Sequence, residues 1–128
     1  MQYRRLSSLS FALASSASAV ASNAVECAHL SDIIIALNTT ITSSWYLPVG
    51  SNFTGTSVES SYNTPQSGLP ELCRAQLTTE TSANSSAMAE VWLPEDWNGR
   101  FLAVGNGGFA GGVNYPDIVG AFERVLQQ

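Results

Sequence analysis

Residues 87–112 read AMAEVWLPEDWNGRFLAVGNGGFAGG, and they carry the clearest structural pattern of the 128-residue chain. Residues 87–93 favour a strand that stops at Pro94, because proline has no backbone N–H to give to a sheet ladder. After a polar turn, residues 100–104 (RFLAV) predict a second strand, apolar nearly throughout, of the kind buried on both faces. Residues 105–112 then hold five glycines in eight positions. The pattern predicts two strands that lead into a glycine-rich loop.

The sequence on either side predicts further elements less sharply. Pro116 can open a helix over residues 117–126, because a proline in the first turn gives up an N–H that has no partner there. Residues 30–37 (LSDIIIAL) fit either a short helix capped by Ser31 or a buried strand, and so short a stretch has no decisive periodicity. Residues 41–47 are expected as an edge strand and residues 50–70 mostly as loop. Residues 72–79 are expected as a half-exposed strand and residues 82–86 as a polar turn.

The composition excludes several classes of protein. Charged residues make up 12% of the chain and lysine is absent, which excludes a Walker-type nucleotide loop, a Schiff-base enzyme and a kinase-type ATP site. Beyond residue 21, three arginines stand against ten acidic residues, so the net charge of −7 argues against nucleic acid or an anionic membrane as partner. The single histidine, His29, cannot form a two-histidine zinc site, and no metal is expected.

Residues 1–21 have the order of a secretory signal peptide. Two arginines stand near the start, an uncharged run fills residues 6–21, and alanines at 17, 19 and 21 offer A-x-A cleavage sites. A mitochondrial presequence is the alternative, since it would also be rich in Arg and Ser. A membrane span needs roughly 20 apolar residues, more than this run supplies. The sequence therefore predicts a secreted, extracellular protein with one small domain over residues 22–128.

Two further features agree with secretion. Three Asn-x-Ser/Thr triplets are predicted glycosylation sites, at Asn38, Asn52 and Asn84. In an oxidising compartment Cys27 and Cys73 are expected to form a disulfide, worth about 4 kcal/mol on the chain-entropy estimate. Two buried thiols are the alternative. A redox or metal role does not fit these cysteines, because no C-x-x-C spacing occurs.

The glycine-rich loop at residues 105–112 admits three interpretations. Its GNGGFA run formally matches the G-x-G-x-x-G/A dinucleotide motif, but that motif opens directly into a helix, and here residues 111–116 intervene. The second interpretation is an oxyanion hole, in which backbone N–H groups around Gly107 and Gly108 stabilise a carbonyl oxygen as it becomes negative. The third is a flexible turn without chemistry.

Residues 91–117, VWLPEDWNGRFLAVGNGGFAGGVNYPD, closely resemble the N-terminal part of the tannase and feruloyl esterase family. Its members carry a V-x-L-P-x-x-W-N-G-R-F-x-x-x-G-N-G-G-x-x-G segment. More loosely, the resemblance reaches back to Cys27 and to a later cysteine like Cys73. The matched positions of the motif are Trp97, Asn98, Gly99, Arg100, Phe101, Gly105, Asn106, Gly107 and Gly108.

The resemblance implies an α/β fold, the N-terminal fragment of an α/β-hydrolase with an incomplete sheet, and a secreted serine carboxylic ester hydrolase. Family members cleave small-molecule aromatic esters of the feruloyl or galloyl type, and many bind calcium in a lid. This chain has no segment like that lid, so no cofactor is expected in it. It also lacks the family's C-S-x-G-G nucleophile segment. The expected contribution is an oxyanion loop at Gly107 and Gly108, without the triad and without activity alone. A non-catalytic secreted fragment or binding protein is the alternative.

Overall fold

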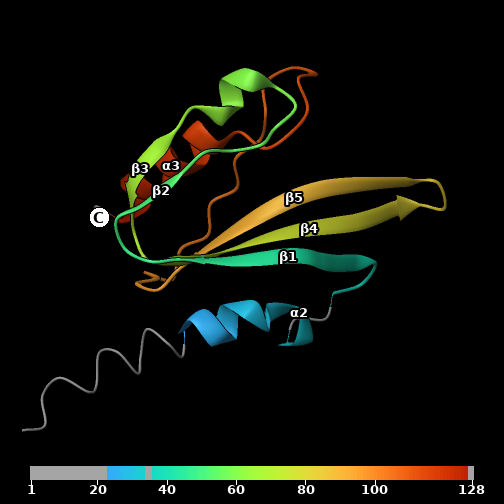
Figure 1. The fold of residues 1–128 in the computed structure, drawn as a ribbon. Coiled ribbons are helices and arrows are strands. Elements are labelled where there is room, and N and C mark those ends of the chain that lie inside the picture. Colours follow the sequence, from blue (N-terminus) through green and yellow to red (C-terminus); the bar gives the residue numbers. More distant parts are fainter. Residues whose placement is uncertain (1–22, 34–35, 127–128) are drawn as a thin grey trace, which may run out of the picture.

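The computed structural model describes residues 23–33 and 36–126, which form a small mixed α/β domain with antiparallel sheets (Figure 1). One sheet has three strands in the order β1-β4-β5, and a second pairs β2 with β3. The mixed α/β class expected from the sequence is confirmed at this level. The elements are β1 (Thr39–Leu47), β2 (Ser51–Phe53), β3 (Gln66–Leu69), β4 (Leu72–Ser82), β5 (Ser85–Pro94), the helices α2 (Leu30–Ile33) and α3 (Tyr115–Leu126), and the 3₁₀ helix η1 (Ser60–Asn63).

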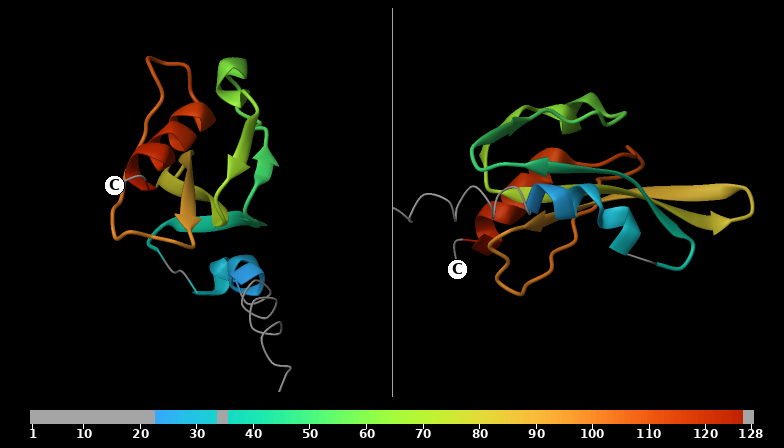
Figure 2. Two further views of the ribbon diagram at one scale, coloured as in Figure 1. Left: turned by 90° about the vertical axis from the view of Figure 1, so that its left-hand side faces the viewer. Right: turned by 60° about the horizontal axis from the view of Figure 1, so that its bottom comes forward.

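The three-stranded sheet carries a different layer on each face (Figures 1 and 2). The helical residues 23–33 lie along β1 on one side, while β2, β3 and α3 lie on the other. Trp45 in β1 pairs with Arg74 in β4, and Arg74 pairs with Trp92 in β5. Since directly opposed residues point to the same side of a sheet, these three side chains share one face, the one that carries α3.

A disulfide joins the helical layer to the central strand. Cys27, only 3% exposed, is bonded to Cys73 in β4. The predicted pairing is confirmed, and the alternative of two buried thiols is wrong. Glu71 adds a polar link between the layers, because its Oε1 accepts hydrogen bonds from Asn23 Nδ2 at 3.3 Å and from Tyr46 Oη at 2.5 Å.

The hydrophobic core lies between the sheet and α3. Its buried members are Leu69, Leu72, Trp92 and Tyr115. The ring of Phe53 in β2 meets Trp92 and Tyr115 edge-on, at centroid distances of 5.6 and 5.0 Å. Aromatic pairs of this kind add about 0.5–1.5 kcal/mol beyond the area they bury. Partly buried side chains complete the core, namely Leu47, Val113, Ile118, Val119 and Phe122.

The predicted helix is confirmed and begins slightly earlier, at Tyr115. Asn114 caps it, because its Oδ1 accepts a hydrogen bond from the Asp117 N–H at 3.2 Å. The same side chain donates through Nδ2 to the Asp117 carboxylate at 2.8 Å. Pro116 falls in the first turn, as expected. Tyr115, 2% exposed, fixes the start of the helix to the core.

Most of the expected strands are confirmed, and one expected loop is wrong. The segment at residues 41–47 lies in β1 at an edge of its sheet, and residues 72–79 lie in β4, which is the central strand. The polar turn at residues 82–86 is the tip of the β4–β5 hairpin. Residues 50–70, expected as loop, contain β2, η1 and β3, because the apolar side chains of this polar segment enter the core.

The second correction concerns residues 100–104, expected as a buried strand. Among the described residues this segment pairs with no strand, and Phe101 is 83% exposed. The turn before it closes locally, because Trp97 Nε1 donates a hydrogen bond to the Arg100 carbonyl at 2.7 Å. Gly99 supports that turn with a φ of 82°. The segment thus turns away from β5 instead of adding a strand to the sheet.

The N-terminal expectations are tested only in part. Leu30–Ile33 is helical, which favours the helix interpretation for that part of residues 30–37. The predicted leader at residues 1–21 lies outside the described residues. Within residues 23–33 and 36–126, no helix has both the length and the apolar character needed to cross a membrane.

Candidate functional site

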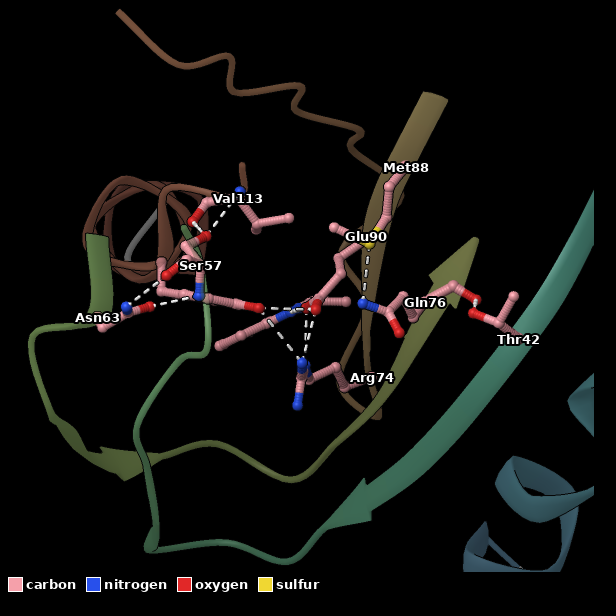
Figure 3. A network of polar contacts seen from close by, with 10 residues as sticks. Thr42, Ser57, Asn63, Arg74, Gln76, Met88, Glu90 and Val113 are labelled. Carbon is pink, nitrogen blue, oxygen red and sulfur yellow. Dashed lines mark hydrogen bonds and ion pairs between the residues drawn. The ribbon is translucent and has the colours of Figure 1, made fainter. Parts of the chain in front are cut away.

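The glycine-rich loop at residues 105–112 is anchored at its end by the segment between β2 and β3 (Figure 3). Ser57 Oγ donates a hydrogen bond to the Val113 carbonyl at 2.5 Å and accepts one from the Val113 N–H at 2.8 Å. Asn63 holds Ser57 in turn, since its Oδ1 accepts from the Ser57 N–H at 2.6 Å and its Nδ2 donates to the Ser57 carbonyl at 2.8 Å. These contacts fix the point where the loop ends and α3 begins.

Gly107 and Gly108, the predicted oxyanion residues, are both exposed. The Gly107 N–H donates to Tyr62 Oη at 3.3 Å, and its carbonyl accepts from the Ala110 N–H at 3.4 Å. Gly108 has a φ of 58°, a conformation that favours glycine. The Gly107 amide is therefore occupied by a phenol, which an incoming oxyanion would have to displace. The role of both glycines in an oxyanion hole stays a prediction.

The glycine-rich loop borders an open cleft of about 740 Å³. Its walls are the second half of β5, residues 97–106 and α3. The cleft is mainly apolar, and its size falls within the roughly 300–1,000 Å³ usual for small-molecule pockets. Asn106 lies at the loop end of the cleft, where its Nδ2 donates to the Gly112 carbonyl at 3.3 Å. The aromatic lining residues are Trp92, Trp97, Phe101 and Phe122.

A buried polar network lies beside the cleft, centred on Glu90 in β5 (Figure 3). The Glu90 side chain is 0% exposed, and that of Arg74 is 10% exposed. Arg74 Nε and Nη2 donate to the two carboxylate oxygens at 2.7 and 2.5 Å. Tyr115 Oη donates to Glu90 at 2.8 Å and Trp92 Nε1 at 3.2 Å. Four donors thus satisfy one buried carboxylate, which joins β4, β5 and α3.

The same network keeps the Arg74 guanidinium charged. The Arg74 guanidinium lies 4.5 Å from the ring centroid of Trp45 and 4.4 Å from that of Phe53, both cation–π contacts. Burial alone would lower the pKa of Arg74, but the hydrogen bonds and charge of Glu90 outweigh it and raise the pKa above its usual value. Burial and the bond to Glu90 also raise the pKa of Tyr115. The network is therefore a structural ion pair.

Asn98 and Arg100 of the motif line the cleft, whereas His29 and the three predicted glycosylation sites lie apart from it. His29 Nδ1 is 3.1 Å from Asp32 Oδ2, and both side chains are largely exposed. Asn38, Asn52 and Asn84 are exposed as well. Across the described part of the chain, no three His, Cys, Asp or Glu side chains come together in a way that could hold a metal ion.

Sequence reasoning missed Glu90 and Ser57. Glu90 carries a readable signal, because it is an acid in an otherwise apolar strand and alternation puts it on the same face as Trp92. A buried acid needs a partner, and the candidates in the described chain are few because lysine is absent. Ser57 carries no such signal, since serines are common throughout its segment.

Tyr46 gives the sheet a pH-dependent contact. Its hydrogen bond to Glu71, with smaller contributions from burial and nearby carboxylates, raises its pKa from 10.0 to about 12. A phenol whose pKa is raised on folding stabilises the fold below pH 10, and that contribution disappears as the pH rises toward 12.

We expect an ultraviolet titration of the folded protein to show a phenol that ionises near pH 12. Tyr46→Phe should take one phenol out of the late ionisation, to which Tyr115 with its raised pKa also contributes, and Glu71→Gln should move the ionisation of Tyr46 to lower pH because the charged acceptor is lost. An unchanged late ionisation in Tyr46→Phe would assign it to another tyrosine and contradict the prediction.

The chain is similar in sequence to several fungal esterases. A probable feruloyl esterase B-1 of Neosartorya fischeri is 36% identical over 117 residues, which cover 84% of this chain and 21% of that protein. Feruloyl esterase B of Aspergillus niger is 35% identical over 92 residues, 72% of this chain and 18% of that protein. Feruloyl esterase C of Talaromyces stipitatus is 41% identical over 70 residues, which cover 50% of this chain and 13% of that protein.

These relatives are much longer than the chain. The matched part spans 13–21% of the three proteins named above. No protein-family model matches the chain.

Proposed function

Because the chain is related in sequence to the tannase and feruloyl esterase family, we propose that it is the N-terminal part of a secreted serine carboxylic ester hydrolase for aromatic esters. In this proposal the sheet and α3 are the opening part of an α/β-hydrolase domain. The catalytic serine, histidine and acid would lie in polypeptide that continues beyond it. The observation that carries the proposal is an apolar cleft that is lined in part by Gly105, Asn106 and Gly112 of the glycine-rich loop, next to Gly107 and Gly108 in the chain.

The chemistry proposed for this segment is stabilisation of charge. When the serine attacks the ester carbonyl, the carbonyl oxygen becomes negative and needs hydrogen-bond donors aimed at it. The Gly107 N–H can turn from Tyr62 Oη to that oxygen, since its present bond is exposed and 3.3 Å long. Removing one such donor typically costs about 10²–10³ in kcat.

The cleft would receive the acyl group of the substrate in the same proposal. Trp97 and Phe101 are largely exposed and line the cleft, so a flat aromatic acid could lie against them. Ser57 and Asn63 support the loop where it ends, at Val113. These contacts would let Gly107 turn while α3 stays in place.

The test uses the chain alone and a chimera in which it replaces the matching segment of Aspergillus niger feruloyl esterase B. The chain alone should not hydrolyse methyl ferulate or methyl gallate above the buffer rate, and turnover would contradict the proposal that the triad lies outside it. The active chimera should lose about 10²–10³ in kcat with Gly107→Pro, which removes the N–H.

Gly107→Ala is the matched control, because it keeps the N–H and an added Cβ there meets no atom within 4 Å. Its kcat should stay close to that of the parent chimera. Equal kcat in the Pro and Ala variants would remove Gly107 from the mechanism. A folded chimera without activity would argue for the alternative, a non-catalytic secreted protein.

A further inference from the structure

Two of the three Asn-x-Ser/Thr triplets meet at one end of the three-stranded sheet. Asn84 lies in the two-residue turn between the paired Ser82 and Ser85, at the tip of the β4–β5 hairpin. Asn38 lies in the turn before β1, and its carbonyl accepts a hydrogen bond from the Glu80 N–H at 2.8 Å. The two turns therefore lie side by side. Figure 1 shows this end of the sheet projecting away from α3.

Both triplets are open to an enzyme. Asn84 and the hydroxyl residue two positions later, Ser86, are exposed, and so are Asn38 and Thr40. Asn38 has a φ of 52°, the left-handed conformation of a tight turn, and it directly precedes β1. The hydrogen bonds of these two asparagines use main-chain atoms. The Asn38 carbonyl accepts from the Glu80 N–H, and the Asn84 N–H donates to Ser82 Oγ.

This end of the sheet lacks cover. Residues 80–89 are exposed throughout, so the hairpin tip is a ribbon with solvent on both faces. A two-stranded ribbon is marginally stable in water, and an open strand edge such as that of β5 can pair with another chain. The apolar Met88 is 55% exposed there. A bulky, soluble group at the tip would hinder such pairing.

We propose that Asn38 and Asn84 carry N-linked glycans that cover the projecting end of the sheet and leave the cleft bare. Met88, where the lining of the cleft begins on β5, is four residues from Asn84, or roughly 13 Å along an extended strand. A glycan at the tip can therefore shield the ribbon without filling the cleft. The inference rests on the secretion included in the proposed function.

The modification is a group transfer from a lipid-linked oligosaccharide donor. A bond forms between the Asn Nδ2 and the first carbon of the sugar, the bond from that carbon to the donor's pyrophosphate breaks, and Nδ2 loses one proton. The hydroxyl two residues on, Thr40 or Ser86, is the recognition element of the triplet. Its replacement should abolish transfer while the asparagine stays in place.

The experiment expresses the full chain in a eukaryotic secretory host, once with its own leader and once with a leader known to enter the pathway. Glycopeptide mass spectrometry should find glycan at both Asn38 and Asn84. Thr40→Ala and Ser86→Ala should each remove one glycan, as should Asn38→Gln and Asn84→Gln. Ser85→Ala, which changes the hairpin tip but keeps the triplet, is the matched control and should keep occupancy at Asn84.

The outcomes separate the two proposals. Glycans found only with the known leader would support these sites and contradict secretion by the chain's own leader. Bare asparagines with the known leader would overturn the inference. The Asn38→Gln, Asn84→Gln double variant should show more light scattering at equal concentration than the glycosylated protein. Equal scattering would overturn the covering role.

Discussion

Glu90→Gln is expected to lower the free energy of unfolding by about 3–5 kcal/mol, the usual cost of breaking a buried ion pair from one side. The variant keeps the shape of the side chain but leaves the Arg74 charge, 10% exposed, without its counter-ion. It also weakens the bonds that Tyr115 and Trp92 make to the carboxylate. Since small domains have only about 5–15 kcal/mol of stability in total, this decrease in the free energy of unfolding should be readily measurable.

Urea unfolding followed by tryptophan fluorescence measures this effect. Glu80→Gln is the matched control, because it removes the same charge from an exposed position on the neighbouring strand, and its midpoint should hardly move. Arg74→Met combined with Glu90→Leu should be less destabilised than Glu90→Gln, because no buried charge is then left unpaired. Equal midpoints for Glu90→Gln and Glu80→Gln would contradict the role of the network.

Gly55→Ala is expected to destabilise the fold by about 3 kcal/mol, the upper part of the usual cost of overpacking. A Cβ at this buried position would lie 2.0 and 2.2 Å from the Cδ2 and Cε2 of Tyr115, and 2.9 Å from Asn63 Oδ1. Neither neighbour can move freely. Tyr115 is held by the core and by Glu90, and Asn63 by the main chain of Ser57.

Gly105→Ala is the control for this substitution, since a Cβ there meets no atom within 4 Å and the residue has no positive φ. Its urea midpoint should match that of the parent protein. If Gly55→Ala unfolds at the same urea concentration as Gly105→Ala, the segment after β2 is not closely packed against Tyr115 at the start of α3.

The sequence predicts the strands where local chemistry decides them. Pro48 and Pro94 end strands because neither can donate to a ladder, and the Ala83–Asn84 turn sits in a run of small polar residues. The short strands β2 and β3 were not predictable, because their polar sequence hides two side chains that enter the core, Phe53 and Leu69. Their pairing depends on a contact that appears only after the chain has folded back.

The error at residues 100–104 has a different origin. An apolar run predicts burial, but it does not say what covers it, and here the run lines an open cleft. The cleft could not be predicted for the same reason, because it requires the positions of β5 and α3 together. The motif around Gly107 was recognisable from its residues alone, whereas Tyr62, its hydrogen-bond partner, lies 45 positions away.

The contact between Ser57 and Val113 has a consequence for how this region can vary. One hydroxyl from the β2–β3 connection bonds both main-chain groups of Val113, so α3 keeps its place whatever the preceding glycines do. Inserting or deleting a residue between positions 107 and 111 should leave the helix and the rest of the scaffold in register. A change in the length of this loop would therefore move its backbone amides while α3 and the sheet stay in place.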